Sequence, residues 1–468
     1  MGVFPQLPPE LIELIVRRLH PIEVATSFRL VNMAAATQFR GPEHSVIRLS
    51  QPVPPHAFAA HWLAPGATRG LTYKQRKQLL CLTAASGVVA NLEVAMRAVG
   101  LPLPPEAFEA AAASGSLAAC QWLRERIPSH HSSEGQGSQL LGAGIQAAAR
   151  AGHRPICEWL LRSWQPPAST GVEAAGAAMA GGHLELADWL LERFGWLVRS
   201  QPHQWQPFLI VSMLEGCDLA ALECRAEGDY NHHLRFHLLV FKDKALAAAA
   251  GSPTPDWAAK VEWLQLEGWL QYPAERVAAL PDGAEALTRL IWLRGRGCRF
   301  NQDVVLSAAR AGNLAALRYL LAVVLRHLDV RPVEAACRGG HLTALRVLHA
   351  AGWGMGAWHA ARCAAEAGHL HVVAWLVEAL GEQAVQLDAW LFAAAAESGS
   401  VELMAWLRER GCPWDESALR RRAEADRAFA AACRNADLAT LRCLRRLGVP
   451  WGSFRGRAGL AVTSVSAA

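Results

Sequence analysis

The chain is poor in lysine and lacks the marks of a secreted or membrane protein. Only five of its 468 residues are lysine, and none follows residue 260. Its 11 cysteines form no C-x-x-C pair, and no basic stretch followed by an apolar run opens the chain. A secreted disulfide framework needs dense, paired cysteines and a signal peptide, whereas the cysteines here are odd in number and dispersed. No uninterrupted apolar run is long enough to span a membrane. We therefore expect a protein of the cytoplasm or the nucleus that has no membrane partner.

Catalytic and metal-binding signatures are missing as well. The sequence contains no His-Glu-x-x-His, no Gly-Lys dipeptide of a P-loop, no Gly-x-Ser-x-Gly and no Gly-x-Gly-x-x-Gly. Its cysteines and histidines are dispersed instead of clustered at metal-ligand spacing. These absences predict a protein that is not an enzyme and has no metal or cofactor.

The charge balance argues against a nucleic-acid partner. Lysine and arginine number 46 and acidic residues 41, which gives a formal net charge of +5, and the arginines are spread along the chain. A nucleic-acid binder usually carries a concentrated basic stripe. With 52% hydrophobic residues the chain has ample material for a folded core, in several domains or in one repeat array.

One phrase recurs along the sequence: small residues, a glycine, often His-Leu, and then a bulky residue followed by leucine. Its seven clear copies have anchor glycines at Gly115, Gly152, Gly182, Gly312, Gly340, Gly368 and Gly399. The bulky residues follow seven positions later, at Trp122, Trp159, Trp189, Tyr319, Val347, Trp375 and Trp406. Weaker copies, two of them anchored at Ala90 and Glu285, bring the array to about twelve units.

Each unit is expected to form a pair of short helices. The small residues before the anchor favour a helix that neighbours can approach closely, and the glycine ends it in a left-handed conformation. A second helix follows with apolar residues at helical spacing, as in Leu370, Val372, Val373 and Leu376. Because neither helix can bury its apolar face alone, stacking of the units would make one continuous core.

This pattern resembles the ankyrin repeat over residues 80–452. The Ala-Ala-x-x-Gly-His-Leu stretches and Gly-Cys-Pro-Trp-Asp at 411–415 carry the resemblance. No unit has the Thr-Pro-Leu-His of regular ankyrin repeats, so we expect divergent units with shortened or missing β-hairpin fingers. The resemblance implies an all-α, helix-pair solenoid that binds a protein target. Residues 453–468 lack periodicity and are expected to be a disordered tail.

Tryptophan and histidine recur at fixed places in the units. Seven of the 18 tryptophans stand at the Trp-Leu position, and we expect them to pack in the core. A second set follows the glycine that closes the unit, and these are candidates to face a partner: Trp196, Trp269, Trp353, Trp414 and Trp451. The histidines after the anchors, His153, His183, His341 and His369, are interpreted as helix-boundary groups that hydrogen-bond the backbone.

The N-terminal segment, residues 4–45, has a different pattern. Leu-Pro-x-Glu-Leu at 7–11 predicts a helix start, followed by apolar Ile15 and Leu19, a break at His20-Pro21, and a second helix through Val24. This resembles an F-box, a helical module that docks on the Skp-type adaptor of cullin–RING ubiquitin ligases. The resemblance implies an apolar docking surface formed by Leu7, Pro8, Leu11, Ile15, Leu19 and Val24.

Two functions remain open at this point. In the first, the F-box-like module binds the adaptor and the repeats bind the target, so the chain is a substrate receptor of an SCF-type ubiquitin ligase. In the second, the chain is a non-catalytic ankyrin-repeat scaffold, and its N-terminal helices only cap the array. Residues 46–79 are interpreted as a connecting segment in both cases.

Overall fold

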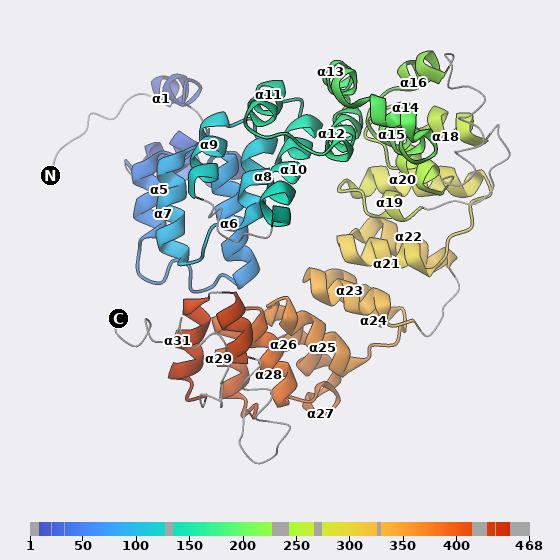
Figure 1. Cartoon of the computed structure of the whole chain (residues 1–468). Coiled ribbons are helices and arrows are strands. Elements are labelled where there is room, and N and C mark those ends of the chain that lie inside the picture. The colour runs from blue at the N-terminus through green and yellow to red at the C-terminus, as the bar shows by residue number, and fades with distance from the viewer. Residues whose placement is uncertain are drawn as a thin grey trace. The chain divides into compact units, whose positions relative to one another are not determined.

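The structure is a computed structural model that describes residues 9–449 except 20, 32, 127–133, 227–242, 266–273, 325–328, 414–427 and 436. Helices dominate this part of the chain, and none of its residues is in a strand. The expectation of an all-helical protein is therefore confirmed, and no β-hairpin finger occurs among the described residues. The expected tail, 453–468, lies outside them. The chain divides into two compact units, residues 1–69 with 75–148 and residues 70–74 with 149–468 (Figure 1).

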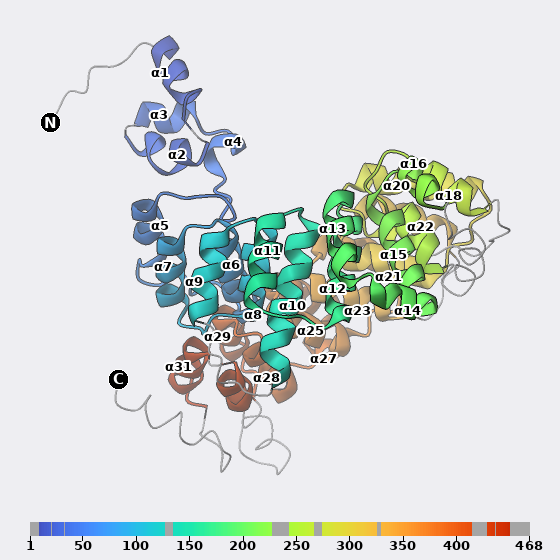
Figure 2. The ribbon, with the colours of Figure 1, turned by 45° about the horizontal axis from the view of Figure 1, so that its top comes forward.

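The first unit begins with a small module of short helices (Figure 2). These are α1 (Pro9–Val16), α2 (Pro21–Thr26), the 3-10 helix η1 (Phe28–Leu30), α3 (Met33–Gln38) and α4 (Pro42–Ser45). The core of the module consists of Val16, Val24 and Phe39, with Ile12, Leu19 and Phe28 packed against it. Because this core is so small, only one side of α1 is covered by the module itself.

Longer helices complete the first unit. They are α5 (Pro55–Trp62), α6 (Tyr73–Ala85), α7 (Val89–Val99), α8 (Pro105–Ala113), α9 (Leu117–Arg126) and α10 (Glu134–Arg150), whose last two residues belong to the second unit. Helix α5 packs against α7, and α8 packs against α9. The connecting segment expected over 46–79 thus contains α5, and its predicted end falls inside α6. The repeated packing begins earlier in the chain than the sequence pattern indicated.

The second unit opens with helix pairs of uneven length. They are α11 (Arg154–Ser163), α12 (Ala168–Ala180), α13 (Leu184–Phe194), α14 (Trp196–Ser200), α15 (Pro202–Gly216), α16 (Leu219–Ala226), α18 (Trp257–Gln265), α19 (Glu275–Ala278) and α20 (Gly283–Gly295), and residues 243–250 are also helical. Helix α12 packs against both α13 and α15. The short helix α14 lengthens this repeat, which explains part of the irregular spacing in the sequence.

The rest of the second unit is more regular. It contains α21 (Gln302–Ala311), α22 (Leu314–Val323), α23 (Arg331–Gly339), α24 (Leu342–Ala350), α25 (Ala357–Glu366), α26 (Leu370–Leu380), α27 (Glu382–Val385), α28 (Ala389–Glu397), α29 (Val401–Glu409) and α31 (Leu438–Arg446), with 428–434 also helical. The first helices of the pairs stack in the order α21, α23, α25 and α28, and the second helices stack in the order α20, α22 and α24. Stacking of helix pairs, as the sequence predicted, holds this part of the molecule together.

Glycine ends the first helix of every clear repeat in the predicted way. All seven anchor glycines have a positive φ, for example +71° at Gly340 and +77° at Gly368. A left-handed residue stops the helix, and only glycine adopts that conformation without strain. Two of the weaker anchors were placed wrongly, since Ala90 and Glu285 lie inside α7 and α20. The boundaries there are at Gly87, with φ +74°, and at Asp282, which caps α20.

Small residues form the interface between stacked first helices. Ala336 in α23 and Ala361 in α25 are fully buried, as is most of the alanine run in α28. The leucine that follows the bulky residue of the second helix is likewise fully buried, as at Leu190, Leu348 and Leu376. Alanine on one helix and leucine on the other thus supply the continuous core that neither helix could form alone.

Candidate interaction surfaces

Helix α1 of the N-terminal module is apolar on two sides. Ile12, Val16 and Leu19 point into the module's core. Leu11, Leu14 and Ile15 stand on the other side at helical spacing and are 46%, 57% and 38% exposed. A surface helix normally has a polar outer face. The outward side of α1 is therefore an apolar surface without a cover inside its own module.

A second group of exposed apolar side chains follows in the same module. Leu30 is 78% exposed, Val31 53% and Met33 81%, and all three come from the η1–α3 segment. Of the 13 large hydrophobic side chains that are exposed in the described part of the chain, eight lie between residues 11 and 47. Apolar patches concentrated in this way mark interaction surfaces more often than chance exposure does. We refer to Leu11, Leu14, Ile15, Leu30, Val31 and Met33 as the module's apolar surface.

The residues predicted to dock an adaptor have different positions in the structure. Leu11 and Ile15 are exposed. Leu19 is half-buried against the core, and Val24 is 0% exposed, so the prediction that Val24 forms part of a docking surface is wrong. Val24 serves as the core residue that α1 packs upon. Leu7 and Pro8 lie outside the described residues.

Sequence reasoning missed Leu14, Leu30, Val31 and Met33. The sequence did contain a signal for Leu14. This short helix has more apolar residues than one helix face can hold, namely Leu11, Ile12, Leu14, Ile15 and Val16. The exposure of the η1–α3 residues had no such signal. It follows from the shortness of α3, in which only Ala35 is buried.

The tryptophans after the closing glycines do not behave as one set. Trp196, at the start of α14, is 55% exposed. Trp353 is only 5% exposed, so the prediction that it faces a partner is wrong, and it belongs to the core of the second unit. Trp269, Trp414 and Trp451 lie outside the described residues. Local position in the repeat therefore does not decide whether such a tryptophan is accessible.

The tryptophans of the Trp-Leu position are not core residues, contrary to the sequence-based expectation. Trp122, Trp189 and Trp406 are half-buried, and only the leucine that follows each one is fully enclosed. Arginine guanidinium groups cover several of the rings. The Arg126 group lies 4.1 Å from the centroid of Trp122, and the Arg410 group 4.0 Å from that of Trp406. Such cation–π contacts allow a large ring to remain partly in water.

Two of the four predicted histidines, His341 and His369, bond to the backbone as expected, and that backbone belongs to the preceding repeat. Nε2 of His341 donates to the carbonyl of Arg310 at 3.1 Å, and Nε2 of His369 donates to that of Arg338 at 3.2 Å. Each ring also lies over the anchor glycine of the preceding repeat, so a Cβ atom added to Gly340 would be 2.6 Å from Cε1 of His369. Burial lowers the pKa of His369. These contacts fix how one repeat sits on the next and give no indication of a catalytic role.

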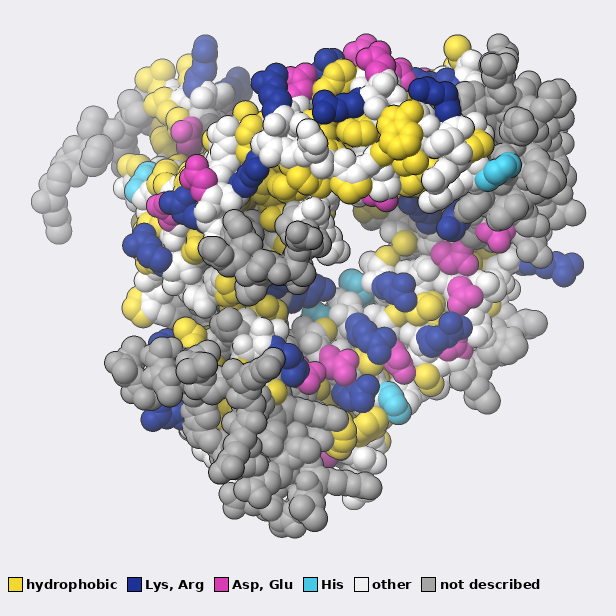
Figure 3. Space-filling model, in the orientation of Figure 1, with side chains coloured by type: hydrophobic (Ala, Val, Ile, Leu, Met, Phe, Trp, Pro, Cys, Tyr) yellow, Lys and Arg dark blue, Asp and Glu magenta, His cyan; other side chains and the backbone are white. Residues whose placement is uncertain are grey.

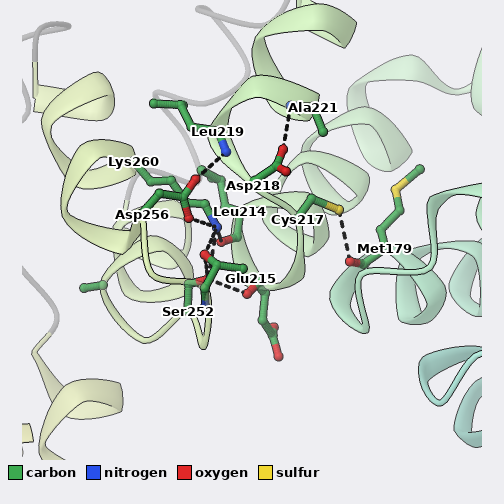
Figure 4. A network of polar contacts seen from close by, with 12 residues as sticks. Met179, Leu214, Glu215, Cys217, Asp218, Leu219, Ala221, Ser252, Asp256 and Lys260 are labelled. Atoms are coloured by element: carbon green, nitrogen blue, oxygen red, sulfur yellow. Dashed lines mark hydrogen bonds and ion pairs between the residues drawn. The ribbon is translucent and has the colours of Figure 1, made fainter. Parts of the chain in front are cut away.

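A buried lysine lies at the centre of a polar network in the second unit (Figure 4). Nζ of Lys260, a residue with no exposed surface, donates to Thr254 Oγ1 at 2.7 Å, Ser252 Oγ at 3.0 Å and the Leu214 carbonyl at 3.2 Å. Asp256 Oδ1 lies 3.7 Å from the same nitrogen. Burial lowers the pKa of Lys260. Because the group is enclosed, it links helix α15 to the start of α18 and offers nothing to a substrate.

Arg289 of α20 reaches the same region and is only 1% exposed. Its Nη1 atom donates to the carbonyls of Ala250 and Ser252 at 2.6 and 2.8 Å, and its Nη2 atom pairs with Glu285. The two buried cations therefore donate to the carbonyls of Leu214 and Ala250, each in the last turn of a helix, and to that of Ser252 in the turn that follows residue 250. Burying polar backbone without such partners would be strongly unfavourable.

Most of the cysteines have the properties of core residues, whereas Cys224 is exposed. Burial raises the pKa to about 12 for the thiols of Cys120, Cys157, Cys298, Cys337 and Cys412. Thiols of this kind are protonated and unreactive at neutral pH. Among the described residues, no three His, Cys, Asp or Glu side chains come together as a metal site would require. No helix of that part is both long and apolar enough to cross a bilayer.

Comparison with known proteins adds no family to this description. No protein-family model matches the chain, and none of the curated protein sequences matches it either.

Proposed function

We propose that this chain is a protein-interaction module and acts as a substrate receptor of an SCF-type cullin–RING ubiquitin ligase. The N-terminal module would dock a Skp-type adaptor, and the helix-pair repeats would bind the target protein. The observation that carries the proposal is the outward side of α1, where Leu11, Leu14 and Ile15 are exposed although the other side of the same helix already packs into a core. A helix of this kind requires a second partner to cover it.

The resemblance to an F-box supports an adaptor as that partner. The Leu-Pro-x-Glu-Leu start, Ile15 and Leu19 match the family's pattern. The tryptophan that usually follows the family's valine is replaced by alanine at positions 34 to 36, and α3 ends at Gln38. The apolar surface of the module is consequently made by α1 and the η1–α3 segment more than by a long final helix.

The repeats support the target-binding half of the proposal. Their anchor glycines, alanine-rich first helices and boundary histidines resemble divergent ankyrin repeats. A stack of this kind presents large surfaces and many modest contacts instead of a reaction centre. We propose that the second unit binds the target through such a surface.

Binding of a purified Skp-type adaptor tests the function directly. We expect the wild-type chain to bind in isothermal titration calorimetry. The double variant Leu11→Asp with Ile15→Asp should bind at least about 100-fold more weakly, because it loses apolar contacts and would bury two carboxylates. Leu63→Asp is the matched control, since Leu63 is 47% exposed but lies outside the module. It should bind like the wild type.

The same experiment separates the proposal from its alternative. Helical circular dichroism of each variant should equal that of the wild type, because the substituted side chains are exposed. If the intact chain does not bind the adaptor, the receptor proposal fails and the non-catalytic scaffold with an N-terminal cap takes its place.

A further inference from the structure

Positive charge is concentrated in one part of the chain. Residues 283–350 contain ten arginines and four acidic residues, a net charge of +6, whereas the whole chain carries +5. The remaining residues are thus close to neutral. Figure 3 shows Lys and Arg side chains gathered over the region of α21 to α24, with some Asp and Glu between them. The arginines that the sequence presented as scattered therefore have a local excess in these repeats.

Most of the acidic residues in this region are already paired with arginines of the first helices and loops. Arg331 contacts Asp303 at 3.2 Å and Asp329 at 2.8 Å, and Arg338 contacts Glu334 at 3.4 Å. The fourth acidic residue, Glu285, pairs with the buried Arg289. No carboxylate of this segment is left for the second helices.

The second helices α20, α22 and α24 each carry an exposed arginine that pairs with no carboxylate of the described residues. Arg294, Arg318 and Arg346 are exposed, and within the described part of the chain none of them has an ion pair or a side-chain hydrogen bond. Helices α22 and α24 contain no acidic residue, and Glu285 is the only one in α20. We refer to Arg294, Arg318 and Arg346 as the arginine row.

Arg318 and Arg346 are in register because the repeats are equally spaced here, whereas Arg294 stands three residues beyond the equivalent position of α20, Ile291. The anchors Gly312 and Gly340 are followed at the same distance by Arg318 and Arg346, so the two arginines occupy the same position on neighbouring helices. Helix α22 contacts both α20 and α24. Packed helices lie about 10 Å apart, and three residues of an extended peptide span about the same length.

The equivalent position has the opposite charge in earlier repeats. Asp188 stands there in α13 and Glu158 in α11, and both are paired, with Arg225 and Arg154. In α22 and α24 the charge has changed sign, and among the described residues no carboxylate pairs with Arg318 or Arg346, although the Arg346 guanidinium lies 6.0 Å from the ring centroid of Trp375. A row of exposed guanidinium groups without carboxylates favours a partner that supplies them, since arginine binds carboxylates through two parallel hydrogen bonds.

We propose that the arginine row binds an extended acidic peptide segment with carboxylates at about every third residue. This inference deepens the proposed function, because it identifies the row as the surface that receives the target protein. Attraction between the row and such a segment would speed encounter and set the position of the target on the repeats. The affinity would fall as salt increases, because exposed charges are screened.

Fluorescence anisotropy with a labelled glutamate-rich peptide, glutamate at every third position, tests the proposal on the full chain. We expect binding at low salt and at least about tenfold weaker binding by the double variant Arg318→Glu with Arg346→Glu. The peptide with glutamine in place of glutamate should not bind. The matched control is Arg97→Glu with Arg199→Glu, which changes the charge equally at two exposed arginines on α7 and α14. It should retain binding.

Several results would overturn the proposal. They are absence of binding, equal binding by the row variant and the control, or binding of the glutamine peptide. Tighter binding of a single-stranded oligonucleotide, lost in the row variant, would assign the row to nucleic acid and refute the peptide. If the charge-reversal variant Arg318→Glu with Arg346→Glu does not fold, the neutral variant Arg318→Gln with Arg346→Gln is tested in its place. No adaptor is present in the peptide-binding assay, so a negative result there does not affect the outcome of the adaptor titration. The row variant should still bind the adaptor.

Discussion

The contact between an anchor glycine and the histidine of the next repeat makes a sharp prediction for Gly340→Ala. An alanine at φ +71° is strained by about 1 kcal/mol. Its Cβ atom would also be 2.6 Å from the ring of His369, which would have to move and give up its hydrogen bond to the Arg338 carbonyl. Crowding of this kind costs about 1–3 kcal/mol, and the lost hydrogen bond about 1 kcal/mol. We therefore expect a total loss of about 3–5 kcal/mol.

Gly411→Ala is the matched control for the backbone strain. Gly411 has φ +75°, and a Cβ atom there would meet nothing within 4 Å. Urea unfolding followed by circular dichroism should show a loss of about 1 kcal/mol for this variant. In the background His369→Ala, the cost of Gly340→Ala should shrink to nearly that of the control, because the clash is gone. Equal costs for the two glycine variants, or an additive double variant, would refute the proposed coupling between repeats.

Further predictions follow from buried groups. Thiol ionisation should leave the free energy of unfolding unchanged below pH 9. Above pH 9 this free energy should fall by about 1 kcal/mol per pH unit for each thiol whose pKa is raised to about 12. A flat alkaline profile in pH-dependent urea unfolding would contradict this expectation. The folded state binds more thiol protons than the unfolded state in that range, so stability decreases as the pH rises. Trp353→Ala should destabilise the chain by about 3–5 kcal/mol and Trp196→Ala by less than about 1 kcal/mol, and similar melting temperatures for the two variants would disprove the assigned burial. Arg289→Met should lower the stability by about 3 kcal/mol, because the carbonyls of Ala250 and Ser252 lose their donor, and no change in unfolding would show that the network is dispensable.

The amino-acid sequence by itself determined the helix pairs and most of their boundaries. An anchor such as Gly340 ends a helix for a local reason, since the left-handed conformation is free of strain only for glycine, and the prediction held at all seven clear anchors. The spacing of apolar residues in the second helices is equally local. The weaker anchors failed at Ala90 and Glu285, because the boundary lies three residues earlier in both repeats, at the left-handed Gly87 and at Asp282, which caps α20.

Only the tertiary structure decided which apolar and charged groups are accessible. Val24 and Leu11 belong to the same matching pattern, yet Val24 lies in the module's core and Leu11 in water, because the burial of each depends on helices that fold back from elsewhere in the chain. Trp353 and Trp196 follow closing glycines alike, and neighbouring repeats enclose one and not the other. The arginine row exists because equal repeat lengths bring Arg318 and Arg346 onto adjacent helices. Ion pairing and burial depend on contacts between segments that are distant in the sequence, so the local sequence pattern does not predict them.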